Sequence, residues 1–339
     1  MRPVALSDVL SWLRSSGLLA DGASLPDVDG NLELTGFAAV DRAGAADATF
    51  WLGASAKSET NANGYASSVF ENVRAGLLFA PPECAGLADR LPGVRCLAVV
   101  ENPYHAMVEF LNRFASDSSN AFAGCSATAQ VHPGAVVEGF VGEGCVIGPG
   151  CVVMRGAKVG AGCVLEANVT VYPNVEIGEG CIFQAGVVVG SRGFGFYEYA
   201  GKRRMVPHYA GVRIGKRCSF GANTVVAAGF VSPTTIGNDC HFDSFVQIGH
   251  NCILGNNIFM ASQSGLAGTV VVEDDVELAG GAQVAGHLTL GKGCRIAAKA
   301  GVTKSIPAGR MVSGFPAIEI NIWRKAMVNL KRLGEKGLR

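Results

Sequence analysis

Two histidines and one aspartate are the side chains in this sequence best suited to acid–base chemistry. His250 follows Gln247-Ile248-Gly249, His287 follows a glycine, and Asp243 precedes His250 by a short stretch. An imidazole changes its charge near neutral pH, and a neighbouring carboxylate orients it and makes it more basic. The three residues therefore predict a general base, provided that the fold brings them together.

A six-residue repeat must position these side chains. A bulky apolar residue recurs every six positions from Val141 to Val189, again from Ile214 to Val226, and in a shifted frame from Ile236 to Val302. A period of six fits neither an amphipathic helix nor an alternating strand, but it fits a short strand plus a turn. Three such units close one triangular coil of about 18 residues. The sequence therefore predicts a mainly β protein built on a parallel β-helix.

The phase of the repeat places the histidines. His250 comes two residues after the bulky Ile248, and His287 comes three residues after Val284, which is two coils further on. Side chains at such positions share one face, about 10 Å apart along the axis. We expect Asp243, in the preceding repeat, to reach an imidazole across a corner. His241 and His132 have no second histidine or carboxylate expected beside them, and we expect them to be ordinary surface histidines.

The eleven cysteines follow the same phase. Eight of them come four residues after a bulky position, which is the second inward slot of the repeat: Cys145, Cys151, Cys163, Cys181, Cys218, Cys240, Cys252 and Cys294. A small apolar side chain fits that slot, and a free thiol behaves as one. We therefore predict buried structural thiols rather than disulfides or metal ligands.

Breaks in the pattern divide the chain. Residues 1–100 alternate helical and short apolar runs, which predicts a small α/β domain. The remaining parts are a connecting helix and linker over 101–124, the β-helix over 125–307 with an aromatic, glycine-rich excursion loop at 191–210, and a C-terminal helical extension over 308–339. The period also slips near 232–235. A loop that leaves a regular solenoid is a frequent place for function.

Charge and hydropathy exclude several classes of protein. The chain has 28 basic and 28 acidic residues, and only 17% of its positions are charged, so it lacks the footprint of a nucleic-acid or polybasic membrane binder. No apolar run is long enough for a transmembrane helix. The first twenty residues are interrupted by Asp8 and Arg14, unlike a signal peptide. We expect a cytoplasmic protein.

A zinc site is the main alternative for the histidines. Trimeric β-helices similar to gamma-class carbonic anhydrases bind zinc through three histidines, two of them five residues apart. Here Gly255 stands five residues beyond His250, and Lys292 stands five residues beyond His287. Because the third ligand is missing, we expect no metal site.

Several segments together resemble a known family. They are the stretch from Phe242 to Asn251, the loop from Gly190 to Phe196, Gly286-His287, and Ser313-Gly314-Phe315-Pro316 followed by Trp323-Arg324-Lys325. These segments resemble UDP-3-O-(3-hydroxyacyl)glucosamine N-acyltransferases, hexapeptide-repeat acyltransferases of lipid A biosynthesis. The resemblance covers nearly the whole chain. Repeats alone would indicate only the broad hexapeptide acyltransferase superfamily. The stretch from Phe242 to Asn251, with His287 at its spacing from His250, is more specific.

The resemblance implies a fold, an assembly and a reaction. The fold would be a left-handed β-helix that forms a homotrimer, with three active sites in grooves between subunits. His250 would take the proton from the sugar 2-amine as it attacks a (3-hydroxy)acyl thioester of acyl carrier protein, and Asp243 would orient it. The backbone N–H of Gly268 would stabilise the oxyanion, and His287 would contact the substrate or polarise the thioester.

The same resemblance implies binding residues. Candidate substrate contacts are Phe50, Phe194, Phe196, Gln247 and Asn251. Lys304 and Arg310 are candidates for steering the acidic carrier protein by charge. The acyl-phosphopantetheine of that carrier would be a co-substrate, and no bound cofactor is expected.

Three departures from the family pattern fall in the presumed nucleotide and sugar region. Phe50-Trp51-Leu52 leads into Gly53-Ala54-Ser55-Ala56, where the family has Asn, Pro and Tyr. Arg192 stands where an Asp is usual, and Val225-Val226-Ala227-Ala228-Gly229 replaces a stretch that contains Asp-Arg-Gly. These departures predict a paralogue with an altered acceptor and weak uridine affinity.

Two other functions stay open. A sugar-nucleotide N-acetyltransferase or formyltransferase would use coenzyme A or a folate and a shorter groove. A noncatalytic trimeric β-helix would serve as a scaffold, and no activity would then depend on His250.

Overall fold

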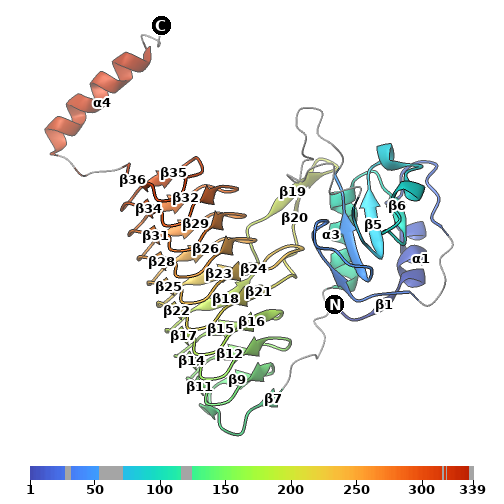
Figure 1. Cartoon of the computed structure of the whole chain (residues 1–339), viewed down its shortest axis with the longest axis horizontal. Coiled ribbons are helices and arrows are strands. Elements are labelled where there is room, and N and C mark those ends of the chain that lie inside the picture. Colours follow the sequence, from blue (N-terminus) through green and yellow to red (C-terminus); the bar gives the residue numbers. More distant parts are fainter. Residues whose placement is uncertain (27–31, 53–71, 116–123, 315–316, 318, 336–339) are drawn as a thin grey trace.

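The computed structural model describes residues 1–26, 32–52, 72–115, 124–314, 317 and 319–335. Within these ranges the chain forms an N-terminal α/β domain, a long triangular prism of short strands, and a C-terminal helix that extends away from the prism (Figure 1). The stretch Gly53 to Ala56, where the family pattern is lost, lies outside the described residues, as does Phe315-Pro316.

The N-terminal domain packs two helices against a small parallel sheet. The sheet order is β3 (Gly36–Phe37), β4 (Asp47–Phe50), β5 (Leu77–Ala80) and β6 (Leu97–Val99), and β1 (Val4–Ala5) pairs with β2 (Glu33–Leu34). Helix α1 (Leu6–Ser16) buries Leu6, Val9, Leu10 and Leu13, the spacing of one helical face. Two 3₁₀ turns, η1 (Pro82–Cys84) and η2 (Ala88–Arg90), lead into β6.

The helix that we expected to be a connector belongs to this domain. Helix α3 (Pro103–Phe114) begins with proline in its first turn and is capped by Asn102, whose side chain accepts from the His105 N–H at 2.9 Å. Its Met107, Phe110 and Leu111 are fully buried, in the same core cluster as α1 and β5. The connection to the prism therefore comes after α3.

The prism is a parallel β-helix with three faces, and each face is one continuous sheet. Face 1 contains β7 (Gly124–Cys125), β10 (Phe140–Val141), β13 (Lys158–Val159), β16 (Val175–Ile177), β21 (Val212–Ile214), β24 (Thr234–Ile236), β27 (Ile253–Leu254), β30 (Val271–Val272) and β33 (Thr289–Leu290). Face 2 contains β8 (Gln130–Val131), β11 (Val146–Ile147), β14 (Val164–Leu165), β17 (Ile182–Phe183), β22 (Ser219–Phe220), β25 (His241–Phe242), β28 (Phe259–Met260), β31 (Glu277–Leu278), β34 (Arg295–Ile296) and β36 (Met311–Val312). Face 3 contains β9 (Val136–Val137), β12 (Val152–Val153), β15 (Thr170–Val171), β18 (Val188–Ser191), β23 (Val225–Ala227), β26 (Gln247–Ile248), β29 (Gly265–Leu266), β32 (Gln283–Val284) and β35 (Gly301–Val302).

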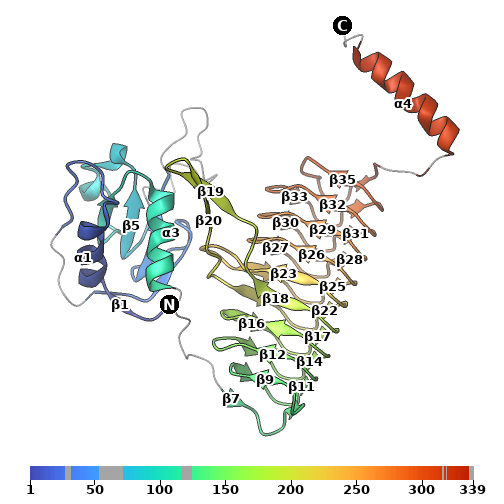
Figure 2. The same ribbon diagram turned by 180° about the vertical axis from the view of Figure 1, so that it is seen from behind.

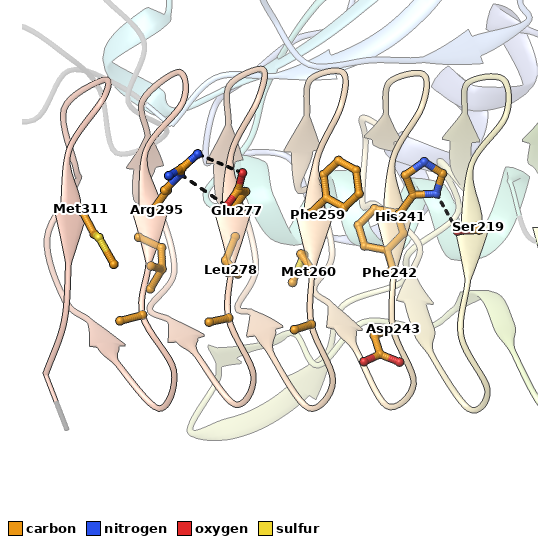
Figure 3. Close-up of a pocket in the computed structure, with 14 residues that line it drawn as sticks. Ser219, His241, Phe242, Asp243, Phe259, Met260, Glu277, Leu278, Arg295 and Met311 are labelled. Carbon is orange, nitrogen blue, oxygen red and sulfur yellow. Dashed lines mark hydrogen bonds and ion pairs between the residues drawn. The ribbon is translucent and has the colours of Figure 1, made fainter. Parts of the chain in front are cut away.

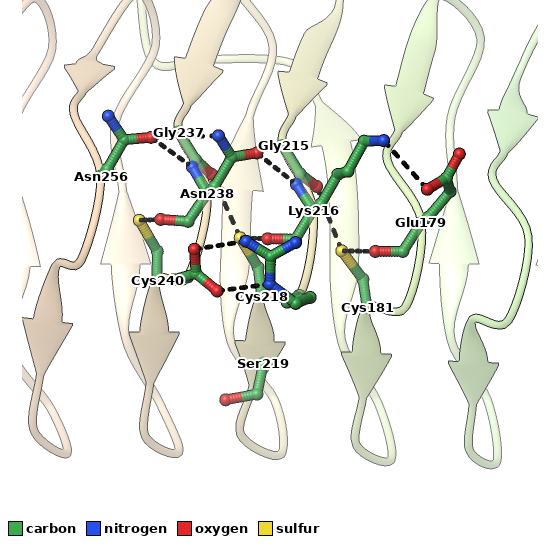
Figure 4. Close-up of polar contacts among 12 residues, drawn as sticks. Glu179, Cys181, Gly215, Lys216, Cys218, Ser219, Gly237, Asn238, Cys240 and Asn256 are labelled. Atoms are coloured by element: carbon green, nitrogen blue, oxygen red, sulfur yellow. Dashed lines mark hydrogen bonds and ion pairs between the residues drawn. The ribbon is translucent and has the colours of Figure 1, made fainter.

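The predicted inward positions form the core of the prism. The rings of Phe183, Phe220 and Phe242 stack on successive coils with centroids 4.7 and 4.9 Å apart. All eight in-phase cysteines are buried and free. Figure 4 shows Cys181, Cys218 and Cys240 on successive coils, where the thiols of Cys181 and Cys218 donate to the carbonyls of Gly215 and Gly237 in the next coil, each at 3.2 Å. The Cys240 thiol donates in the same way to the Gly255 carbonyl, at 3.3 Å. The prediction of structural thiols is therefore confirmed.

The excursion loop joins the two parts of the molecule. Strands β19 (Phe196–Tyr199) and β20 (Lys202–Met205) form an antiparallel hairpin that lies beside α3 in both views (Figures 1 and 2). The Tyr197 hydroxyl lies 2.8 Å from Nδ1 of His105, and Tyr199 stacks on the same imidazole with centroids 3.6 Å apart. The hairpin therefore fixes how the N-terminal domain packs on the prism.

The C-terminal extension forms helix α4 (Ile320–Glu335), close to the predicted residues. All its described side chains are exposed, including Trp323 and Leu330. None of the helices in the described ranges combines the length and the apolar character that a membrane span requires.

Candidate active site

The repeat brings His250, Gly268 and His287 together. His250 follows β26 at the corner between faces 3 and 1, and the other two residues occupy the same corner in the next two coils. The Thr269 N–H donates to the His250 carbonyl at 2.8 Å, and the His287 N–H donates to the Gly268 carbonyl at 3.2 Å. The phase of the repeat predicted that His250 and His287 share a face, and the family resemblance pointed to Gly268. We call this column of residues the His250 corner.

Two glycines enclose the His250 imidazole. A β-carbon added to Gly268 would lie 2.5 Å from Nε2 of His250, and one added to Gly193 would lie 2.6 Å from the His250 β-carbon. Any larger residue would collide with the ring at either position. The imidazole therefore lies directly on the Gly268 backbone, with the excursion loop closing over its other side.

The N–H of Gly268 is available to a ligand. Its carbonyl accepts from His287, but its N–H donates to no other group among the described residues. The equivalent N–H of Gly286, one coil further on, is free in the same way, so the repeat itself leaves this donor open. An open backbone donor beside an imidazole can stabilise an oxyanion.

Asp243 does not contact His250 within the chain, and the expectation that it reaches across a corner is wrong for a single subunit. Its two carboxylate oxygens accept from the backbone N–H groups of Ser244 at 2.7 Å and Ser262 at 3.1 Å. Asp243 lies at the corner between faces 2 and 3, whereas His250 lies at the next corner of the triangle. The neighbour of the His250 Nδ1 is instead Oδ1 of Asn251, at 3.1 Å.

Asp243 borders a groove along face 2 (Figure 3). The groove encloses about 750 Å³ and follows a row of outward side chains on successive coils: Ser219, His241, Phe259, Glu277, Arg295 and Met311. His241, expected to be an ordinary surface residue, bonds Ser219 at 2.7 Å and packs on Phe259 with ring centroids 5.1 Å apart.

A second imidazole, which the sequence did not reveal, lies beside His250. The ring centroid of His208 is 4.9 Å from that of His250, and His208 is 8% exposed. Burial, and to a smaller extent the charge of His250, lower the pKa of His208 to about 4, so this imidazole stays neutral near pH 7. His208 lies in the excursion loop, outside the repeat, so the phase could not place it.

A cleft of about 510 Å³ separates the N-terminal domain from the prism. Phe50, Tyr104 and Phe230 form its aromatic wall, with Phe50 and Phe230 each packed within 5.6 Å of the Tyr104 ring centroid. His287 and Asn251 line the side that belongs to the prism. An aromatic wall suits a planar ring, and Phe50, one of the predicted substrate contacts, is part of this wall.

The remaining predicted residues are spread more widely. Phe194 is 89% exposed and makes an edge contact with Phe196, with centroids 5.1 Å apart, in the loop directly after Gly193. Lys304 lies at the His250 corner, two residues after the end of β35. Gln247 is exposed in the middle of face 3, and Arg310 precedes β36 on face 2, so the structure brings neither one to His250.

No group of three or more His, Cys, Asp or Glu side chains in the described ranges is placed to hold a metal ion. Metal ligands must converge at short distances, whereas His250 and Asp243 lie at different corners of the prism.

Comparison with known proteins assigns the repeat and the family. Residues 156–191 match the family described as bacterial transferase hexapeptide (six repeats), and residues 211–243 match the hexapeptide repeat of succinyl-transferase. The UDP-3-O-acylglucosamine N-acyltransferase of Helicobacter hepaticus is 37% identical over 268 residues, which cover 78% of this chain and 81% of that protein. The chain belongs to the UDP-3-O-acylglucosamine N-acyltransferase family.

Other relatives match a smaller part of the chain. The UDP-3-O-acylglucosamine N-acyltransferase of Methylorubrum extorquens (strain PA1) is 36% identical over 149 residues, which cover 44% of this chain and 42% of that protein. The chain thus spans less than half the length of several of the curated relatives that it matches. A solved UDP-N-acetylglucosamine acyltransferase of Francisella novicida is 24% identical, with a TM-score of 0.47, covering 60% of this chain and 73% of that one. The predicted mainly β fold, a left-handed parallel β-helix of hexapeptide repeats with a small α/β domain and a C-terminal helix, is confirmed.

Proposed function

We propose that this chain is an N-acyltransferase that moves an acyl group from a thioester to a primary amine, with His250 as the general base. The observation that carries the proposal is the His250 imidazole lying on Gly268, whose backbone N–H is open, at the edge of an aromatic cleft. Base, oxyanion donor and binding cleft are the parts that an acyl transfer needs.

The reaction follows from these groups. The neutral amine attacks the thioester carbonyl carbon, and Nε2 of His250 takes one of its protons as the C–N bond forms. The carbonyl oxygen becomes an oxyanion, which the Gly268 N–H stabilises. The C–S bond then breaks, the imidazolium returns the proton to the thiolate, and the products are an amide and a free thiol.

The family suggests the two substrates. The acyl donor would be an acyl carrier protein, whose acyl-phosphopantetheine enters as co-substrate, and Lys304 at the His250 corner supplies a cation for this acidic partner. The acceptor would be a UDP-3-O-acylglucosamine-like amine of lipid A biosynthesis, as the names of the relatives suggest. The enzyme would act as a cytoplasmic homotrimer.

The cleft supports an acceptor with a planar ring. Phe50, Tyr104 and Phe230 offer aromatic faces and edges, while Asp41 and Arg42 supply charges at its rim. His287 lies between this cleft and Gly268, where it would contact the acceptor near the reacting amine. Phe194 and Phe196 would cover the substrate from the excursion loop.

Acceptor-dependent loss of the thioester tests the proposal. Purified protein is mixed with acylated carrier protein and candidate amines, and mass spectrometry follows the thioester and the amide product. We expect the amide to appear only when carrier protein and a suitable amine are both present. A noncatalytic scaffold would produce no amide with any amine, and an acetyl- or formyltransferase would prefer a short-chain donor.

Binding of UDP narrows the acceptor. Because Gly53-Ala54-Ser55-Ala56 replaces the Asn, Pro and Tyr of the family and Arg192 replaces an Asp, we expect UDP to bind weakly. Isothermal titration with UDP measures this affinity directly. Tight binding would contradict the altered acceptor without affecting the assignment of the acyl-transfer chemistry.

A further inference from the structure

The side-chain amide of Asn251 makes three hydrogen bonds within the chain. Its Oδ1 accepts from the Phe230 N–H at 3.2 Å and lies 3.1 Å from Nδ1 of His250, while its Nδ2 donates to the Ser232 carbonyl at 2.7 Å. Asn251 was predicted to bind substrate. Its amide instead bonds the preceding residue, His250, and the loop between β23 and β24.

These partners fix which way the amide points. The oxygen and nitrogen of an asparagine amide are told apart by their hydrogen-bond partners. Here one partner is a backbone donor, Phe230, and the other is a backbone acceptor, Ser232. A reversed amide would place N–H against N–H and oxygen against oxygen. The atom that faces His250 is therefore the oxygen, which can only accept a hydrogen bond.

We infer that Asn251 is a positioning residue that fixes the tautomer of His250. Because Oδ1 accepts, Nδ1 of the neutral imidazole must carry the hydrogen, and Nε2 keeps its lone pair. Nε2 is the ring atom that lies over Gly268, where a reacting amine would meet the open backbone donor. The inference rests on the proposed role of His250 as the base, and it gives Asn251 the orienting role that was expected of Asp243.

The loop between β23 and β24 contains the frame slip near residues 232–235. This loop supplies the Phe230 N–H and the Ser232 carbonyl that bond the Asn251 amide. Thr234, which is fully buried, accepts from the Asn251 N–H at 2.9 Å and donates to the Ala227 carbonyl at 2.7 Å. This irregular corner therefore holds both the backbone and the side chain of Asn251.

Asn251→Gly tests the inference with little backbone strain. Asn251 has a φ of 59°, a left-handed conformation that glycine adopts readily, so the variant removes the amide and keeps the turn. The matched control is Asn257→Gly. Asn257 has a φ of 56° and a side chain that only bonds the exposed Asp275, at 2.9 Å.

Two readouts separate a positioning role from a merely structural one. In ¹⁵N NMR spectra of the neutral imidazole of His250, with its signals assigned by their loss in His250→Gln, we expect a protonated Nδ1 and an unprotonated Nε2 in the wild type. Asn251→Gly should show a mixture of both tautomers, and its kcat should fall by up to about 10²-fold, because the base is also less well oriented, with little change in the KM of the acceptor. Asn257→Gly should match the wild type in both.

Asn251→Asp keeps an oxygen in front of Nδ1 and should retain the Nδ1-protonated tautomer, although its second oxygen loses the bond to the Ser232 carbonyl. A wild type whose hydrogen is on Nε2, or an Asn251→Gly variant with unchanged tautomer and kcat, would overturn the inference. If Asn251→Gly lost its native thermal unfolding transition, the Asp variant and the wild-type spectrum would still decide the tautomer. The NMR result is independent of turnover, so failure of the proposed acyl transfer and failure of the tautomer assignment are distinguishable.

Discussion

At the scale of single residues, the space around His250 is set by two glycines rather than by charged partners. The ring lies between Gly268 and Gly193, and its Nδ1 bonds a neutral amide. A rigidly held neutral imidazole is suited to take a proton without a large reorganisation of its surroundings. The identity of the glycines therefore matters as much to this site as the identity of the base.

Replacement of Gly268 by alanine should remove activity and leave the fold intact. The new β-carbon would lie 2.5 Å from Nε2 of His250 and would push the base off the open N–H. Misplacement of a base by about 1 Å costs on the order of 10²-fold in rate. We expect at least that loss in kcat with an unchanged thermal unfolding temperature. The control is Gly301→Ala, whose β-carbon would meet nothing within 4 Å, and equal loss in both variants would contradict the account.

The lowered pKa of His208 predicts how the free energy of unfolding depends on pH. Folding lowers its pKa from 6.5 to about 4, so the unfolded chain binds a proton more readily once the pH falls below 6.5. The stability that the neutral form contributes is present above pH 6.5, is lost progressively down to about pH 4, and amounts to about 3 kcal/mol in all. Urea unfolding across this range should show a smaller loss in His208→Gln.

The control for this measurement is His132→Gln, because His132 is exposed. It should lose stability with falling pH as the wild type does. If His208→Gln follows the wild-type curve across the whole range, burial of a neutral His208 is not what makes the folded chain acid-sensitive.

The sequence predicted most of the site residues inside the repeat, and it missed several of the residues outside it that border the site. His250 and His287 could be aligned because a fixed period converts chain position into spatial position, whereas Gly268 was expected from the family resemblance. His208, Phe230 and Tyr104 come from loops and from the other domain, where no period applies. Asp243 was expected to reach His250, but the phase of the repeat does not show which corner of the triangle a residue occupies. Asp243 follows a strand of face 2 and His250 follows a strand of face 3, so the two residues lie at different corners.

At the scale of elements, the prism is stabilised by side chains stacked on successive coils. Phe183, Phe220 and Phe242 form such a stack, and the thiols of Cys181, Cys218 and Cys240 bond carbonyls of the neighbouring coil. The period of six predicted this core because each inward residue meets its counterpart one coil away. It could not predict the hairpin of β19 and β20, which pairs locally and packs on α3.

Two phenylalanines should respond in opposite ways to replacement by alanine. Phe220 is 1% exposed within the stack, and its loss should lower the free energy of unfolding by about 3–5 kcal/mol. Phe194 is 89% exposed, so Phe194→Ala should leave stability unchanged and instead raise the KM of the acceptor. Urea unfolding and steady-state kinetics measure the two effects. A destabilised Phe194→Ala protein with a normal KM would refute the proposed contact with substrate.

At the scale of the whole molecule, His250 and Asp243 lie at different corners of the prism, so the two side chains could meet only across two chains. His250 and the aromatic cleft lie at one corner, while Asp243 lies at the next, on the groove of face 2 (Figure 3). In the proposed homotrimer, the groove of one subunit would face the His250 corner of its neighbour. Asp243 would then stabilise the imidazolium that forms during the reaction, while Asn251 sets the tautomer.

Subunit complementation tests this arrangement. His250→Ala and Asp243→Ala should each have strongly reduced activity as pure trimers. Coexpressed chains carrying the two changes should regain part of the activity, because some interfaces then combine an intact His250 with an intact Asp243. Mixed trimers with no more activity than the two pure variants would show that Asp243 does not act across the interface.

The most direct test of the central claim is the rate of amide formation in His250→Ala compared with the wild type. Both proteins are incubated with acylated carrier protein and an accepted amine at saturating concentrations, and the amide is quantified by mass spectrometry. General-base catalysis contributes about 10²- to 10⁴-fold, so the variant should be slower by that factor while it remains a folded protein with the wild-type unfolding temperature. Equal rates in the two proteins would contradict the account.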